Sequence, residues 1–210
     1  MVDSDERFPA ASGLPEYPAE RRNLSFQGES VETMIELLRR RRSIRKFMPK
    51  IVEPATVGLL LESLLRAPSS RGINPWEFVL VDDPAVLTEL ARSKQHGSEF
   101  LKGAPLAIIV CADGTKSDVW VEDCSIAAII VQLTALSMGL GSCWVQIRNR
   151  QHNMSRTSEE FIRGLLGLPD HIMVEAIIGI GYPAERKSPV PAGDLQHDKV
   201  WHNSYANPFS

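Results

Sequence analysis

Positive charge is concentrated in one short stretch of the sequence, although the 210-residue chain has a formal net charge of only −3. Six cations lie within eight residues: Arg39, Arg40, Arg41, Arg42, Arg45 and Lys46. Ser43 interrupts them with a hydroxyl. Guanidinium groups grip phosphate oxygens as a fork, and a serine hydroxyl adds a short neutral hydrogen bond, so the pattern predicts a phosphate cradle.

Two other interpretations of this stretch stay open. Cations at a helix C-terminus complement its dipole, which could account for Arg39 and Arg40. It accounts less well for Arg42, Ser43 and Arg45, because the helical apolar pattern has lapsed there. Nucleic acid would be a third ligand, but no aromatic residues are interleaved for base stacking and the rest of the chain is acidic. We therefore predict no nucleic-acid partner.

A second candidate is the segment APSSRGINP at residues 67–75, which is rich in small residues, glycine and proline. It is either a simple helix-to-strand connection or a backbone that approaches a flat ligand. In the second case Ser69, Ser70 and Asn74 would offer polar contacts. The glycines of GLGSCW (139–144) and GIGY (179–182) do not form the G-x-G-x-x-G fingerprint, so the sequence does not support a dinucleotide-binding fold of that type.

Other site chemistries find little support. The sequence has no G-x-S-x-G elbow and no metal-ligand spacing, and its five histidines lie in polar or loop-like contexts. Cys111 and Cys124 fall in apolar segments, which indicates core residues. With Cys143 the cysteines number three and form no C-x-x-C pair, which argues against a disulfide framework and fits a reducing compartment. Because no signal peptide is seen either, we expect a cytoplasmic protein.

Helical and strand patterns alternate along the chain. Ser30 is expected to cap a first helix whose apolar face comprises Val31, Met34, Ile35 and Leu38. Further helices are predicted from Pro54, over 83–94, over 120–138 with Gly139 as its C-cap, and from the Thr157/Glu160 capping box to Gly167. Strands are predicted at 76–81, 106–112, 141–147 and 174–182.

These elements indicate an α/β or α+β domain in which helices cover a small central sheet. We expect an N-terminal extension at residues 1–29, the domain at 30–182, and a C-terminal arm at 183–210. The stretch 126–140 is nearly uncharged but too short to span a bilayer, so a buried central helix and no membrane partner are expected. Because this helix is apolar all round, a partner subunit is the natural cover for its outer side.

Taken together, the motifs resemble the nitroreductase family of flavoproteins over residues 31–205. The matching pieces are RRSIRKF (41–47), APSSRGINPWEFVLV (67–81), GLGSCWVQI (139–147) and IGYPAERK (180–187). The resemblance implies an α+β fold with a central β-sheet flanked by helices, in an intertwined homodimer with FMN at the subunit interface. It also implies two-electron transfer from NADH or NADPH to a small-molecule substrate such as a nitroaromatic or a quinone.

The resemblance carries site roles to individual residues. Arg41, Arg42 and Ser43 would hold the phosphate and ribityl end of FMN, and Arg45 would approach the pyrimidine ring. Pro68, Ser69 and Ser70 would line one side of the isoalloxazine. The remaining expected contacts are Asn74 at the ring edge, backbone N–H groups of Val145, Gln146 and Ile147, and the phosphate cations Arg186 and Lys187.

One departure from the family pattern concerns the loop 67–75. Many members carry Asn and Gln where this chain has Gly72 and Asn74. Gly72 offers no side chain, so a different flavin contact is expected there, from Arg71 or from the backbone. The tail after Pro189 also lacks an arginine seen in some members.

The resemblance further implies a mechanism. Hydride would arrive at flavin N5, and a cation fixed near the N1–C2=O edge would favour the reduced form, with Arg45 as the candidate. One open face used in turn by both substrates predicts ping-pong kinetics. The alternatives are a dehalogenating or flavin-fragmenting relative with residues 95–103 as part of a lid, a non-enzymatic FMN-binding protein, and an RNA-binding module.

Overall fold

The chain divides into two units in a computed structural model that describes residues 25–26, 29–30 and 32–208. One unit is Met34–Pro189 and carries every predicted site residue. The other contains the described residues up to Thr33 and those from Val190 onward. Most of the predicted N-terminal extension lies outside the described residues.

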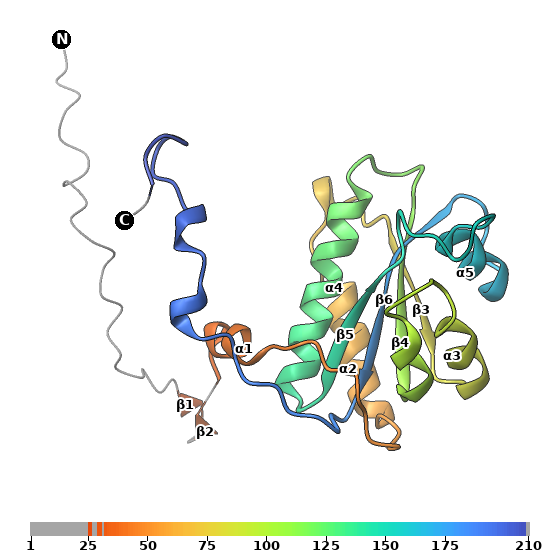
Figure 1. Cartoon of the computed structure of the whole chain (residues 1–210), viewed down its shortest axis with the longest axis horizontal. Coiled ribbons are helices and arrows are strands. Elements are labelled where there is room, and N and C mark those ends of the chain that lie inside the picture. Colours follow the sequence, from red (N-terminus) through yellow and green to blue (C-terminus); the bar gives the residue numbers. More distant parts are fainter. Residues whose placement is uncertain (1–24, 27–28, 31, 209–210) are drawn as a thin grey trace, which may run out of the picture. The chain divides into compact units, whose positions relative to one another are not determined.

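The centre of the larger unit is a four-stranded sheet in the order β3-β4-β6-β5 (Figure 1). Its strands are β3 (Trp76–Val81), β4 (Leu106–Asp113), β5 (Gly141–Gln146) and β6 (Ile172–Gly181). All neighbouring strands are antiparallel, so the fold class is α+β and not α/β. Every residue of β4 is buried, because this strand is central and is covered on both faces.

Helices cover both faces of this sheet and make three layers (Figure 1). On one face lie α2 (Pro54–Leu65) and α4 (Trp120–Ser137), and on the other α3 (Pro84–Leu90) and α5 (Ser158–Leu166). The alternation of strand side chains supplies a core to each face. Thus Ile108 packs toward α2 and α4, whereas its neighbour Ile109 packs toward α3 and α5.

The predicted helix ends are confirmed where a side chain or a glycine specifies them. Thr157 Oγ1 accepts a hydrogen bond of 3.1 Å from Glu160 N, and Thr157 N donates one of 2.8 Å to a Glu160 carboxylate oxygen, which together form the capping box. Gly167 follows α5 with a φ of 66°, and Gly139 follows α4 with a φ of 77°. Glycine is favoured at both positions because a Cβ disfavours this left-handed conformation.

The start of the first helix was predicted wrongly. Helix α1 covers Met34–Arg40, and Ser30 belongs instead to β2 (Glu29–Ser30), which pairs with β1 (Ser25–Phe26). The expected apolar face is also wrong, because Leu37 is the buried residue of α1 whereas Met34, Ile35 and Leu38 are about half exposed. Val31 lies outside the described residues.

The third helix is shorter than predicted, since α3 ends at Leu90 rather than near Lys94. Turns follow it, and Ser98 Oγ donates a hydrogen bond of 2.8 Å to Ala91 O that closes this connection. The 3-10 helix η2 (Glu99–Gly103) then packs onto the sheet, with Leu101 fully buried and the Phe100 ring over Gly179.

Helix α4 is the one described helix whose length and composition would allow it to cross a membrane. Its packing against the sheet, with Ala127, Ala128 and Val131 fully buried, is that of a core helix. Ile126 and Ile129 on its other side are 39% and 37% exposed. The helix therefore has one covered and one open apolar side in the single chain.

The smaller unit contains short elements. Besides the β1–β2 pair it has the 3-10 helices η3 (Ala192–Asp194) and η4 (His197–Lys199). Near its end the rings of Trp201 and Tyr205 stack with centroids 4.2 Å apart.

Candidate functional site

Residues 39–46, called the arginine segment below, are fixed along one side by the edge strand β5. Ser43 bridges to Ser142 in a parallel arrangement, and Ile44 N donates a hydrogen bond of 2.9 Å to Ser142 O. This approach requires Gly141, because a Cβ there would lie 2.8 Å from Ile44 Cβ. Gly141, the first residue of β5, can therefore carry no side chain without local displacement.

The chain after β6 fixes the segment along its other side. Met48 N donates to Tyr182 O and Ala184 N donates to Lys46 O, each at 2.8 Å. Lys187 Nζ donates a hydrogen bond of 2.5 Å to Ser43 O. Residues 182–187 therefore run beside the arginine segment and bring a second set of cations to it.

Glu185 is the carboxylate that organises this contact. One of its oxygens accepts hydrogen bonds from Arg45 N at 2.5 Å and Lys46 N at 3.2 Å, and it lies 3.5 Å from Lys187 Nζ. The bond from Arg45 N is the main reason that the pKa of Glu185 lies below its usual value. The sequence prediction missed Glu185, because a lone glutamate in a loop carries no local signal.

A cavity of about 320 Å³ opens between the two segments and the C-terminal end of α4. Its cationic lining consists of Arg40, Arg41, Arg42, Arg186 and Lys187. Ile44, Leu136 and Leu140 form an apolar wall, and the buried Gln132 adds an amide. Five cations against the single carboxylate of Glu185 make this a site for an anion with an apolar extension.

The structure thus brings four of the predicted phosphate ligands together around one cavity, namely Arg41, Arg42, Arg186 and Lys187. Arg42 Nη1 also donates to Ser188 O, which links the two segments. Ser43 and Arg45 belong to the same segment but do not line the cavity.

Cys143 lies beneath the segment and is buried. Burial raises the pKa of its thiol, against the opposing effects of Arg45 and of a hydrogen bond from Ser43. Burial also raises the pKa of Cys111 to about 12, and it raises that of Cys124. These thiols therefore stay protonated, and Cys111 and Cys124 are core residues as expected.

The outer edge of β5 runs away from the cavity. Ser142 O points outward to Ile44, so in the antiparallel pattern the backbone groups of Trp144 and Gln146 point to the same side. Of the three residues predicted to face the ring, Gln146 has this orientation. The N–H of Ile147 instead donates to Glu175 O at 3.2 Å, and Val145 and Ile147 bury their side chains.

Lys94 stands at the far end of this edge and was not predicted. Its Nζ donates a hydrogen bond of 3.5 Å to Gln146 O. Burial and the nearby Arg150 lower its pKa. This cation could not be recognised in the sequence, where it is only the last residue of the helix predicted over 83–94.

The loop 67–75 is held in a tight conformation by its own polar groups. Ser69 Oγ donates to Asn74 Oδ1 at 2.7 Å and accepts from Asn74 N at 2.8 Å. Arg71 and Asn74 have φ values of 54° and 51°, which are unfavourable for residues with a Cβ. Gly72, with a φ of 66°, has open space where a side chain would lie.

Asp123 of α4 anchors this loop and was also missed. Its Oδ1 accepts a hydrogen bond of 2.8 Å from Ser70 N, and the residue is only 2% exposed. No sequence signal marked it, because it adjoins Glu122 in the first turn of α4, where carboxylates are common.

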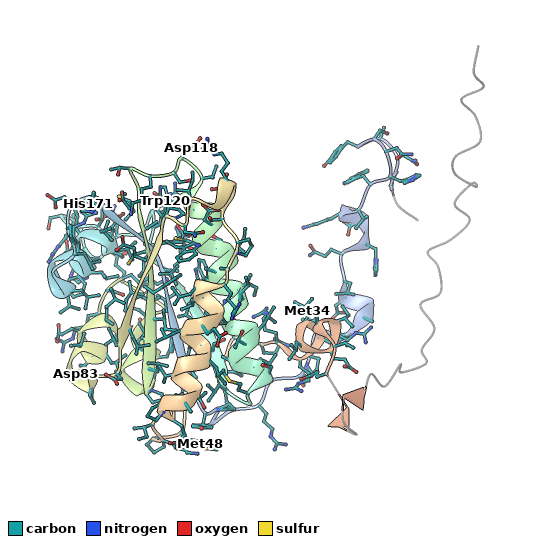
Figure 2. All side chains as sticks on the ribbon, turned by 180° about the vertical axis from the view of Figure 1, so that it is seen from behind. Met34, Met48, Asp83, Asp118, Trp120 and His171 are labelled. Atoms are coloured by element: carbon teal, nitrogen blue, oxygen red, sulfur yellow. The ribbon has the colours of Figure 1, made fainter. Side chains whose placement is uncertain are left out.

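The loop and the cavity lie at opposite ends of the three-layer body. Figure 2 shows Asp118, which lies 3.7 Å from Arg71 of the loop, at one end and Met48, which follows the arginine segment, at the other. Along α4, Asp123 and the cavity residue Leu136 are separated by about 20 Å at 1.5 Å per residue. The loop also precedes β3, whereas the cavity adjoins β5 at the other edge of the sheet. One chain therefore does not bring the loop residues to the cavity residues.

Comparisons with known proteins agree on the family. The model of the nitroreductase family matches residues 38–182. A relative from Archaeoglobus fulgidus, provisionally named NADH dehydrogenase/NAD(P)H nitroreductase, is 32% identical over 168 residues, which cover 78% of this chain and 93% of the relative. One from Methanothermobacter thermautotrophicus with the same name is 34% identical over 155 residues, covering 72% and 78%.

A solved structure is also similar. That of an FMN-dependent nitroreductase from Clostridium difficile has a TM-score of 0.81 and 45% identity, and the match covers 82% of this chain and all of that one. The family match spans well over half of the chain and includes the arginine segment, the loop, β5 and the end of β6. This chain belongs to the nitroreductase family.

Proposed function

We propose that this protein is an FMN-dependent oxidoreductase that passes two electrons from NADH or NADPH to a small oxidant such as a nitroaromatic or a quinone. The carrying observation is the cavity in which Arg41, Arg42, Arg186 and Lys187 converge beside β5. The names of the relatives, an NAD(P)H nitroreductase and an FMN-dependent nitroreductase, support the same chemistry.

The donor set fits the phosphate end of FMN. A phosphate monoester carries up to two negative charges, and arginine groups bind its oxygens in pairs. The apolar wall of Ile44, Leu136 and Leu140 would cover the adjoining carbon chain. From there the open edge of β5 would offer backbone groups at Trp144 and Gln146 to a flat ring.

Each part of the site then has a task that needs no nucleophile from the protein. Bound FMN would supply the two-electron chemistry. The arginine segment would hold the phosphate, β5 would orient the ring by backbone hydrogen bonds, and Arg45 and Lys94 would place positive charge near it. The buried thiols take no part, because their raised pKa values keep them protonated.

A homodimer would complete the site. Pro68, Ser69, Ser70 and Asn74 are expected at the ring, yet in one chain they lie at the opposite sheet edge from β5. A second copy can supply this loop to the cavity of the first, and two-fold symmetry then makes two equal sites.

The exposed apolar side chains of the larger unit support this assembly. Seven of the eleven large exposed apolar side chains of this unit lie on α1, on α2 and on the outer side of α4, to which both of these helices pack. They are Met34, Ile35 and Leu38 on α1, Leu59 and Leu65 on α2, and Ile126 and Ile129 on α4. Monomeric soluble proteins rarely leave large apolar surfaces open, so this face is where the second copy would dock.

The experiment is an absorbance spectrum of the purified protein followed by anaerobic addition of NADH or NADPH. We expect a bound flavin spectrum that is bleached by one or both donors and restored by a quinone or a nitroaromatic. Parallel lines in double-reciprocal plots would identify ping-pong kinetics. A flavin that binds but is not reduced would indicate a binding protein, and absence of flavin binding would contradict the proposal.

A further inference from the structure

Glu175 is a carboxylic acid inside the sheet, with 4% of its surface exposed. It sits on β6 where the register shifts, because Cys111 pairs with Val174 and Val110 pairs with Ala176. Glu175 is therefore the extra residue of a β-bulge. Bulges re-aim side chains and are frequent beside active sites.

Hydrogen bonds link the side chain of Glu175 to the open edge of β5. A Glu175 carboxyl oxygen, Oε1, accepts a hydrogen bond of 3.4 Å from Gln146 Nε2. Gln146 Oε1 in turn accepts one of 3.0 Å from Trp144 Nε1. The backbone oxygen of Glu175 also accepts from the N–H groups of Ile147 and Arg148, at 3.2 and 3.1 Å. Glu175 thus holds the end of β5 through both its side chain and its backbone.

The second carboxyl oxygen, Oε2, is buried and has no hydrogen-bond partner among the residues that the structure describes. An ionised carboxylate in that position would lose its hydration without compensation, which costs far more than burying the neutral acid.

The surrounding charges do not reverse this preference. Arg148, beyond the end of β5, attracts negative charge, but it makes no ion pair with Glu175 within residues 32–208. Glu122 of α4 and Glu159 of α5 repel negative charge, and the thiol of Cys124 is neutral. Burial is the largest effect and raises the pKa of Glu175.

We propose that Glu175 is a positioning residue that keeps a proton inside the folded protein and holds, through Gln146, the end of β5 that faces the flavin. The part concerning the flavin rests on the proposed function. A neutral acid at this place adds no negative charge beside the ring when electrons arrive, whereas an ionised one would oppose its reduction.

The first test uses the protein without FMN. Glu175→Gln preserves the size of the side chain and an acceptor for Gln146 but cannot ionise. The unfolded glutamate loses its proton near pH 4.3, whereas the folded protein retains it to higher pH. Above about pH 4.3 the unfolding constant of the wild type should therefore rise relative to the variant, by about tenfold per pH unit, until the folded group also ionises.

Glu77→Gln removes one exposed carboxylate from β3 and serves as the matched control, whose ratio to the wild type should stay nearly flat. If Glu175→Gln folds poorly because of its amide, Glu175→Met supplies a neutral side chain of similar length. A flat ratio for the Glu175 variant would overturn the proposal.

The second test measures the midpoint potential of the FMN-loaded protein against pH. Above the pH at which the titration without FMN shows that the folded carboxyl ionises, the potential of the wild type should fall more with rising pH than that of Glu175→Gln, because only the wild type then gains a negative charge. Superimposable profiles in that range would overturn the flavin part of the inference. A wild type that binds no FMN would overturn the proposed function and the flavin part of this inference, and the titration without FMN still decides the buried proton.

Discussion

Lys187 Nζ donates a hydrogen bond of 2.5 Å to Ser43 O, across 144 positions of the chain. The bond joins the two segments that supply the cations of the cavity. Neither segment belongs to a strand or helix at this point, so their mutual contacts keep the like charges together. The carboxylate of Glu185, 3.5 Å from the same Nζ, offsets part of the repulsion.

Replacing one cavity cation should show whether the cavity binds the phosphate of FMN or its ring. Arg41→Ala should weaken FMN by roughly ten- to more than a hundredfold, since a charged hydrogen bond contributes about 1.5–3 kcal/mol. Riboflavin, which lacks the phosphate, should bind almost unchanged. Arg39→Ala removes an exposed cation near the end of α1 that does not line the cavity, and it is the control. Fluorescence titration with both flavins measures the effect, and equal losses would refute the phosphate assignment.

Glu185 should make the stability of the protein sensitive to acid. Its folded-state pKa is lowered, first by the hydrogen bond from Arg45 N and then by Lys46 N and Lys187. Its contribution is therefore present above the unfolded value of about 4.3 and is lost as the pH falls through the lower folded value. Urea unfolding should show a smaller acid-induced loss for Glu185→Gln than for the wild type. The exposed Glu53→Gln should follow the wild type, and identical curves for all three would contradict this role.

Much of the fold was predictable because its signals are local. The apolar run of β4, the capping box of Thr157 and Glu160, and Gly139 after α4 each depend on neighbouring residues. The face of α1 was mispredicted because its period is satisfied by Met34, Ile35 and Leu38, which remain exposed in the single chain. A hydrophobic period predicts that one face of a helix is covered. It does not show whether the same chain or a second molecule covers that face.

The sequence predicted the segments that form the site but not the contacts that hold them together. Arg41, Arg42, Arg186 and Lys187 were named from the sequence and line one cavity. Glu185, Lys94 and Asp123 were missed because each acts on a backbone atom far along the chain: Arg45 N, Gln146 O and Ser70 N. Such contacts arise from tertiary structure and leave no spacing pattern.

Asp123 should be needed for the conformation of the loop 67–75. Asp123→Ala leaves Ser70 N without its buried acceptor, which should cost about 1–3 kcal/mol of unfolding free energy. Amide exchange should accelerate in the loop more than in β3. Glu122→Ala changes the exposed neighbour on the same helix and should leave both measurements nearly unchanged. A loop that exchanges at the wild-type rate in Asp123→Ala would show that other contacts hold it.

Mixing two defective variants should reveal whether each site uses two chains. One variant carries Arg41→Ala, and the other carries alanine at Ser69, Ser70 and Asn74 together. In mixed dimers the intact cavity of one chain meets the intact loop of the other, so random exchange should restore roughly a quarter of the sites. FMN titration after unfolding and refolding the mixture measures this recovery. No recovery, with mixed dimers present by mass spectrometry, would place each site within one chain.

Arg45 should affect the midpoint potential of the flavin and not the binding of its phosphate. Its side chain is exposed and does not line the cavity, while its backbone N–H is held by Glu185. If the guanidinium lies near the N1–C2=O edge, its removal weakens the reduced state more than the oxidised one. A differential charged contact of about 1.5–3 kcal/mol would lower the two-electron midpoint of Arg45→Gln by about 30–65 mV. Lys46→Gln, the adjacent exposed cation, controls for net charge. Redox titration of FMN-saturated protein decides the matter, because a cation that only binds phosphate would loosen FMN and shift the midpoint by less than about 10 mV.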